Sequence, residues 1–230
     1  MNILLLSLNG DDSESKQLVP DKYGYGLFDV VEPPYNLISL SRIYEVSAAN
    51  FAAINAKVSN IVGLGYSFME TRKTNDALDA ISDDKQLDRA RRKLNRLRQD
   101  LYDWLEDCNE EETFTETLIK AYTDVEATGN GFIEIGRTVN GDIGYVGHIP
   151  STTIRIRRLR DGFMQIIAQK VVYFRNFGAT NPNPVTADPR PNEIIHIKEY
   201  SPLNTYYGIP DIVAAIPSLL GDQLASQYNI

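Results

Sequence analysis

The chain has 230 residues and a formal net charge of −8, and 43% of its residues are hydrophobic. That length is enough to bury a sizeable core, and the composition argues against a disordered chain. The acidic balance argues against a sequence-specific DNA-binding protein, which needs a basic face to neutralise phosphates. The single cysteine, Cys108, excludes an internal disulfide, and no apolar run reaches the roughly 18 residues of a membrane span. We therefore expect a globular protein of a reducing compartment, with no membrane partner.

Residues 1–36 are expected to form an extended arm. A polar break from Gly10 to Glu14 and the pair Pro33-Pro34 leave no helical period. Such an arm is either poorly ordered or lies on a neighbouring molecule.

A helix is predicted over residues 37–62, because apolar residues recur there at spacings of three and four. Gly63 and Gly65 follow it and are typical of a helix end. The next stretch, 64–70, is a candidate for a short strand.

A long amphipathic helix is predicted over residues 83–108, with an apolar stripe from Leu87 to Cys108. Its charges are segregated. Residues 83–99 hold seven basic and three acidic side chains, whereas residues 100–112 hold seven acidic side chains and no basic one. Acidic groups near a helix C-terminus oppose the macrodipole. Two interpretations stay open: a solvated face with local ion pairs, or a basic end that meets the acidic end of the next copy in a head-to-tail ring.

Thr113 and Glu116 have the spacing of a capping box, which predicts a helix over about 114–127 that ends at Gly129. Residues 128–131 read Thr-Gly-Asn-Gly. This segment lies between a helix and a strand, the reverse of the order in phosphate-binding loops. We therefore expect a helix end and the start of a strand there.

Two turn signals, each ending in glycine, predict antiparallel hairpins. The expected hairpins join 131–138 to 143–148 across Asn140-Gly141, and 152–159 to 163–174 across Asp161-Gly162. In the second hairpin Ile154 and Ile156 alternate with Arg155 and Arg157, so one face is apolar and the other basic.

The remaining elements are a proline-rich loop over 176–192, a strand over 193–199 and a helix from Pro210 to about 228. Pro217 should bend that helix. The helix carries a stripe of small residues that lets another backbone come close, either in its own domain or in another copy. The stripe consists of Ala214, Ser218, Gly221 and Ala225.

No pattern marks a catalytic, cofactor-binding or metal-binding site. No Walker loop and no G-x-S-x-G elbow occur. His148 and His196 lie in separate strand-like segments, and we expect both to be hydrogen-bonded sheet residues. Cys108 is expected to be a buried helix residue. The sequence therefore predicts a protein without cofactors that is not an enzyme.

Three stretches together resemble the portal proteins of long-tailed phages. The first is Pro33-Pro-Tyr-Asn-Leu-Ile-Ser-Leu with the helix from Asn50 to the Val-Gly-Leu-Gly-Tyr that ends at residue 66. The second is Asp124-Val-Glu-Ala-Thr-Gly-Asn-Gly-Phe-Ile-Glu-Ile, a joint between helix and strand. The third begins at His196 and carries Tyr-Tyr-Gly-Ile-Pro-Asp before a helix. Their order and spacing carry the resemblance, which covers about 33–229.

The resemblance implies an α+β wing domain over 37–200, after the arm of 1–36. Residues 201–230 would be a linker and the first stem helix. On this resemblance the clip, second stem helix and crown of a portal protein would be absent from this chain, which would be either a fragment or a reduced version of a portal protein. It also implies a structural subunit of a ring, typically of twelve copies, at the capsid vertex. The ring would be a conduit for DNA packaging and ejection and would dock terminase and the head–tail adaptor.

Further implied partners are the major capsid protein, the scaffold and double-stranded DNA that passes without sequence-specific binding. The protein would be assembled in the host cytoplasm and found in the virion. Two alternatives stay open. A metal-dependent nucleic-acid-processing enzyme would gather carboxylates in one pocket. Another capsid or tail component would form oligomers of a different symmetry.

On this interpretation the candidate residues serve assembly. Candidates for pairing between subunits are Arg89, Arg91, Arg92, Asp103, Glu106 and Asp107. Candidates for stem packing are Ala214, Ser218, Gly221 and Ala225, and those for facing the channel are Asp222, Gln223 and Gln227.

Overall fold

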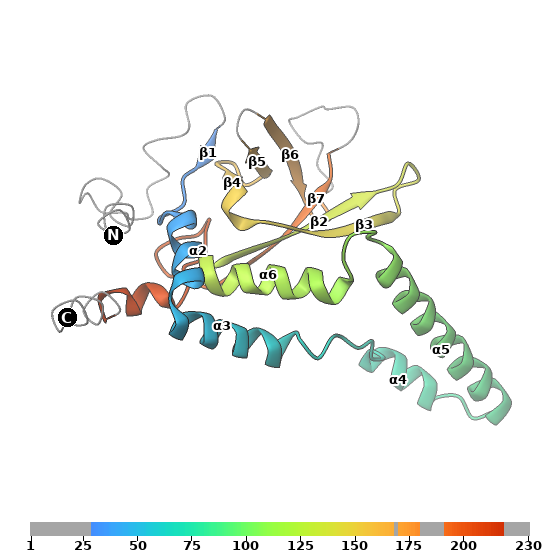
Figure 1. Cartoon of the computed structure of the whole chain (residues 1–230). Coiled ribbons are helices and arrows are strands. Elements are labelled where there is room, and N and C mark those ends of the chain that lie inside the picture. The colour runs from blue at the N-terminus through green and yellow to red at the C-terminus, as the bar shows by residue number, and fades with distance from the viewer. Residues whose placement is uncertain (1–28, 168–169, 180–190, 219–230) are drawn as a thin grey trace.

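The computed structural model describes residues 29–167, 170–179 and 191–218. Within these ranges the chain has the mixed α+β fold that the sequence predicts, with one sheet, helices on one of its faces and a projecting helical arm (Figure 1). The strands are β1 (Val30–Val31), β2 (Asn130–Arg137), β3 (Ile143–Ile149), β4 (Ile154–Arg157), β5 (Gly162–Ile167), β6 (Lys170–Asn176) and β7 (Glu193–Lys198). The helices are α2 (Leu37–Val46), α3 (Ala48–Ile61), α4 (Arg72–Asp79), α5 (Asp84–Asp107) and α6 (Phe114–Thr128).

The described strands form a single sheet in the order β1-β4-β5-β6-β7-β2-β3. All neighbours are antiparallel except β6 and β7, which are parallel. Both predicted hairpins are confirmed, β2 with β3 and β4 with β5. The prediction of one strand over 163–174 is wrong, because β5 ends at Ile167 and β6 pairs back against it from Lys170.

The last part of the predicted arm belongs to the sheet. Val30 and Val31 are buried and pair with β4 at the sheet edge. Residues 1–28 lie outside the described part of the chain, so this finding concerns only the end of the arm.

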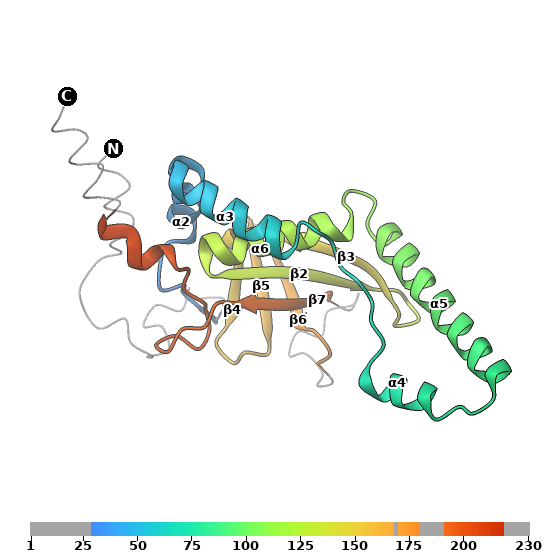
Figure 2. The same ribbon diagram turned by 90° about the horizontal axis from the view of Figure 1, so that it is seen from below.

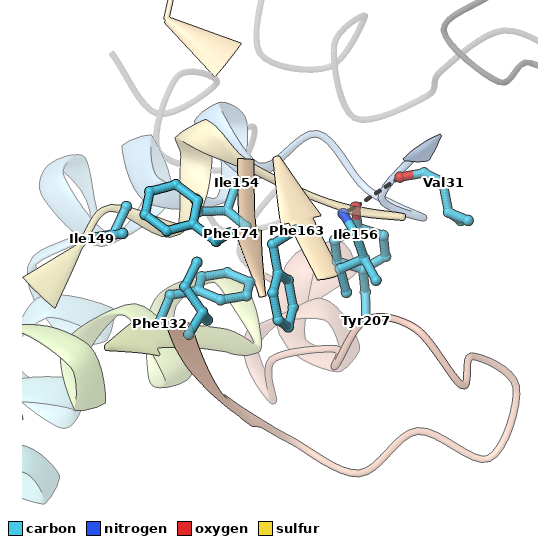
Figure 3. Close-up of a cluster of buried hydrophobic side chains, with 9 residues drawn as sticks. Val31, Phe132, Ile149, Ile154, Ile156, Phe163, Phe174 and Tyr207 are labelled. Carbon is cyan, nitrogen blue, oxygen red and sulfur yellow. Dashed lines mark hydrogen bonds between the residues drawn. The ribbon is translucent and has the colours of Figure 1, made fainter. Parts of the chain in front are cut away.

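One core cluster lies on one side of the sheet, around the rings of Phe132, Phe163 and Phe174 (Figure 3). Tyr207 closes this core from the segment after β7 and is fully buried. Its hydroxyl donates to the carbonyl of Val31 at 2.7 Å and accepts from the backbone nitrogen of Ile156 at 3.0 Å. The segment after the last strand is therefore part of the body and bonds to edge strand β1 and to its neighbour β4.

The helices cover the other side of β2 and β3. Helix α6 packs on these strands through a second cluster that includes Ala121, Ile133 and Val146. Helices α2 and α3 pack in turn against α6, so the body has layers of strand, helix and helix (Figures 1 and 2).

The prediction of one helix over 37–62 is wrong in one respect, because the chain breaks at Ser47 into α2 and α3. Ser47 has an extended backbone with φ −94° and ψ 105°, and its side chain accepts from the nitrogen of Asn50 as the N-cap of α3. The predicted strand over 64–70 is absent. That segment is an irregular strap in which Tyr66 and Phe68 contact α5.

The ends of α6 follow their local signals. The predicted capping box is present: the backbone nitrogen of Thr113 donates to the Glu116 carboxylate at 2.8 Å, and that of Glu116 donates to the Thr113 hydroxyl at 3.2 Å. Gly129 ends the helix in the left-handed conformation, with φ +81°.

Candidate assembly surfaces

The most prominent feature of the surface is a helical arm formed by α4 and α5, distinct from the predicted N-terminal arm of residues 1–36. It leaves the body and points away from the sheet (Figures 1 and 2). Helix α5 has 24 residues and is therefore about 36 Å long. Of its residues only Leu105, near the body, is buried. The long helix predicted from the sequence is thus confirmed, and most of its length is exposed.

The strap covers the inner side of the C-terminal half of α5. The ring of Tyr102 lies 5.4 Å from that of Tyr66 and 4.9 Å from that of Phe68, and Arg98 forms an ion pair with Glu70. These contacts fix which side of α5 faces inward.

Two polar contacts hold the base of the arm on the body. The side-chain amide of Asn109 donates to the carbonyl of Val146 at 3.1 Å. The Glu112 carboxylate accepts from the backbone nitrogen of His148, from Thr117 and from Lys120. Burial raises the pKa of Glu112, but these hydrogen bonds outweigh burial and leave the pKa lowered. Glu112 is therefore charged at neutral pH and ties the arm to β3.

The outer face of α5 carries the segregated charges. Positions i, i+3, i+4 and i+7 share one face of a helix, and two successive sets with this spacing occur. All eight side chains are exposed, and they form what we call the outer face: Arg89, Arg92, Lys93 and Arg96, then Asp100, Asp103, Trp104 and Asp107. Beside this face Leu97 is 53% exposed and Leu101 is 38% exposed, and Trp104 within it is 37% exposed.

The structure separates the six residues predicted for subunit pairing. Arg89, Arg92, Asp103 and Asp107 lie on the outer face. By helical spacing Arg91 lies on the opposite side. Glu106 points toward the strap, where it accepts from the hydroxyl of Tyr66 at 3.3 Å.

A second surface is a cleft of about 680 Å³ between β5, β6, β7 and residues 205–206. The guanidinium of Arg160 lies 4.3 Å from the centre of the Tyr206 ring, and Lys198 donates to the carbonyl oxygens of Thr205 and Tyr206. In the described part of the chain no carboxylate forms an ion pair with either cation. Burial and then the nearby Arg160 lower the pKa of Lys198. The cleft is thus suited to an anionic group, and sequence reasoning missed it because its cations are 38 positions apart.

Both histidines are hydrogen-bonded sheet residues, as predicted. Nε2 of His148 lies 2.9 Å from a carboxylate oxygen of Asp124, and Nε2 of His196 lies 3.1 Å from the side-chain oxygen of Asn130. Burial, followed by the charge of Lys198, lowers the pKa of His196 to about 3, so it is neutral at physiological pH. Among the described residues no group of three or more potential ligands could hold a metal ion.

Cys108 is buried at the C-cap of α5, as the sequence predicts. Its Sγ lies 3.2 Å from the carbonyl of Leu105, and burial raises the pKa of the thiol. A raised pKa keeps the thiol protonated and unreactive at neutral pH.

Residues 128–131 form a helix end and the start of a strand, as predicted. The side chain of Asn130 is fully buried and bonds to the backbone of Thr128 and Gly208, so the segment is occupied by the chain itself. The Asn130 side chain and the Gly208 backbone therefore fill the space that a bound phosphate would need.

The C-terminal helical residues 212–218 begin a third surface. Ile212, Val213 and Ile216 pack against α2, while Ala214 and Ser218 are exposed. The other predicted stem-packing residues, Gly221 and Ala225, lie outside the described residues. So do the predicted channel-facing residues Asp222, Gln223 and Gln227.

No family model matches the chain. In sequence it is 28% identical to the phage-like element PBSX protein XkdE of Bacillus subtilis (strain 168), over 96% of this chain and 50% of that protein. It is 24% identical to the uncharacterized protein YqbA of the same strain, over 94% of this chain and 47% of that protein. The chain therefore spans about half the length of these relatives.

In fold the chain is similar to one in the neck of an empty GTA (gene transfer agent) particle, a structure computed with six-fold symmetry. The TM-score is 0.64 at 17% sequence identity, over 94% of this chain and 51% of that chain. This likeness shows that the α+β fold, arm and body together, occurs in a known protein chain. No helix among the described residues is both long and apolar enough to span a membrane.

Proposed function

We propose that the chain is a structural subunit of a phage-derived particle, at the neck between head and tail. One observation carries this conclusion. Over nearly the same length, 96% and 94% of the chain, its sequence is similar to a protein of a phage-like element and its fold is similar to a chain of a particle's neck. Shared sequence and shared fold over the whole chain favour a shared structural role over a chance likeness of one domain.

More specifically, we propose that copies of the chain form a portal ring at the capsid vertex. The ring would let DNA pass during packaging and ejection, and would dock terminase and the head–tail adaptor. The stretches that resemble portal proteins support this proposal. One of them is the joint of α6 and β2 around Gly129, and another runs from His196 through Tyr207 into the C-terminal helical residues.

In this proposal residues 37–200 are the wing, and the helix that starts near residue 212 is the first stem helix. The side of that helix turned away from α2 bears the exposed Ala214 and Ser218. Small exposed side chains let the backbone of a neighbouring helix approach closely, which supports packing of stems around an axis. The net charge of −8 suits a channel wall that repels phosphate.

The experiment is the native mass of the chain by light scattering, together with negative-stain imaging. Rings of about twelve subunits with a central hole are expected for a portal. Rings of another symmetry would favour another capsid or tail component. A chain that stays monomeric at the highest soluble concentration would contradict the proposed ring.

Stem packing has its own test. Gly221→Leu is expected to prevent rings while the body stays folded, because the added side chain keeps neighbouring helices apart. Ala215→Leu is the matched control, since it lies on the same helix outside the small-residue stripe. Normal rings from the Gly221 variant would contradict the packing proposal.

A further inference from the structure

The outer face of α5 is self-complementary about residue 98. Each basic residue on one side of that point has a partner at the same distance on the other side. Three of these are acidic, and the fourth is an aromatic ring, which attracts a cation through its face. The matched positions are Arg89 with Asp107, Lys93 with Asp103, Arg96 with Asp100, and Arg92 with Trp104.

We propose that the outer face of α5 binds the same face of a second copy, with the two helices antiparallel and crossing near residue 98. Both charged halves lie on one face. A second copy can place opposite charges against both halves only if its own outer face is presented with the helix direction reversed. Such a contact has a two-fold axis, which makes it isologous. Every matched pair then forms twice, once on each side of the axis.

The apolar side chains at the crossing support this geometry. Leu97 lies next to the centre of the charge pattern and is 53% exposed, although it is a large hydrophobic residue. In the antiparallel pair Leu97 of each copy approaches that of the other, and Trp104 of each copy flanks them. Between Arg98 and Glu106 the inner side of the helix is already covered by Tyr66 and Phe68, so in this half the outer side is the one that remains for a partner.

This contact differs from the one that closes a ring. A cyclic ring needs two different faces on each subunit, whereas an isologous contact uses one face twice. The inference therefore goes beyond the proposed ring. For Arg89, Arg92, Asp103 and Asp107 it replaces head-to-tail pairing with antiparallel pairing, which joins two copies or two rings.

The first test reverses the charges of each half separately. One variant carries Lys93→Glu and Arg96→Glu, and the other carries Asp100→Lys and Asp103→Lys. Each variant alone is expected to have half the native mass of the unchanged chain, because like charges then face each other in the pair. The ratio holds whether the unit that pairs is one copy or one ring, so a failure of the ring does not mask the result.

An equimolar mixture of the two variants is expected to regain the full mass. In a mixed pair each reversed residue again faces an opposite charge, at both ends of the contact. The mass of the unchanged chain should also fall toward half as ionic strength rises, since exposed ion pairs are screened by salt.

The matched control carries Lys73→Glu and Arg91→Glu, which change the net charge as much as Lys93→Glu with Arg96→Glu but lie outside the outer face. Its mass is expected to equal that of the unchanged chain. Variants of the outer face that keep the doubled mass, or an unchanged chain that never pairs, would overturn the inference. If instead the variant with Lys93→Glu and Arg96→Glu kept its mass and only lost affinity for a DNA duplex, the basic half would be a nucleic-acid contact and the proposal would be wrong.

A second test locates the axis without altering charge. Leu97→Cys is expected to give a covalent dimer with a short bifunctional maleimide, whereas Arg91→Cys on the opposite side is not. Head-to-tail contact would hold the two residues 97 roughly a helix length, about 36 Å, apart. Absence of the Leu97 cross-link in a chain that does pair would therefore overturn the antiparallel geometry.

Discussion

The side chain of Asn130 holds the backbone of Gly208 with two hydrogen bonds, across 78 positions of sequence. Its oxygen accepts from the Gly208 nitrogen at 2.8 Å, and its nitrogen donates to the Gly208 carbonyl at 3.2 Å. The same amide also bonds to the carbonyl of Thr128 and to the ring of His196. Asn130 is therefore the point where the end of α6, strand β7 and the segment that leads to the C-terminal helix meet.

Asn130→Ala is expected to lower the free energy of unfolding by about 2–4 kcal/mol, because it leaves the buried N–H of Gly208 without a partner. Chemical denaturation measures the change. Asn75→Ala, on the exposed side of α4, is the matched control and should change stability by less than about 0.5 kcal/mol. Equal effects of the two variants would contradict the central role of Asn130.

Gly129→Ala should destabilise the chain far more than Gly141→Ala. Both glycines have positive φ, +81° and +90°, so alanine costs about 1–2 kcal/mol in backbone strain at either position. A Cβ at Gly129 would also lie 2.6 Å from the carbonyl of Gly208, whereas nothing lies within 4 Å of one at Gly141. Thermal unfolding of the two variants separates backbone strain from close packing. Similar melting temperatures would show that the backbone at Gly208 moves aside with little loss of stability.

Tyr207→Phe is expected to cost about 1–3 kcal/mol, since it removes one hydroxyl that serves the carbonyl of Val31 and the N–H of Ile156. The loss should be greatest at β1, so hydrogen exchange of the Val31 and Ile156 amides should speed up. Tyr200→Phe is the control, because Tyr200 is strongly exposed. Unchanged exchange at the edge strand would contradict the role assigned to this hydroxyl.

The stability of the chain should depend on pH through His196. The folded pKa of His196 is about 3, against 6.5 in the unfolded chain, so the unfolded state binds the proton first as the pH falls. The free energy of unfolding should therefore decrease as the pH falls below 6.5. His196→Asn should flatten the decrease between pH 6.5 and about 5, above the range in which most carboxylates titrate. His148→Asn is the matched variant, and a His196 variant with the slope of the unchanged chain would rule out this source of pH dependence.

Elements with strong local signals were predicted well from sequence. The long helix α5, the capping box of Thr113 and Glu116, and the Asn140-Gly141 hairpin all match the structure. The break at Ser47 was missed although serine is a common N-cap, because the apolar spacing continues across it. The strap of 64–70 was misassigned because its aromatic residues pack against α5, a contact that local pattern does not reveal.

The sequence by itself determined helices α5 and α6, the hairpins of β2 with β3 and of β4 with β5, the segregation of charge along α5 and the absence of a recognisable catalytic motif. Each of these depends on residues within a few turns of one another, so period, cap and turn chemistry suffice. Only the tertiary structure decided the strand order, the partners of Asn130 and Tyr207, and the cleft of Arg160 and Lys198. It also decided which side of α5 is covered and which remains open. Those features join distant segments, and their energies come from burial and hydrogen bonds that exist only once the whole body has packed.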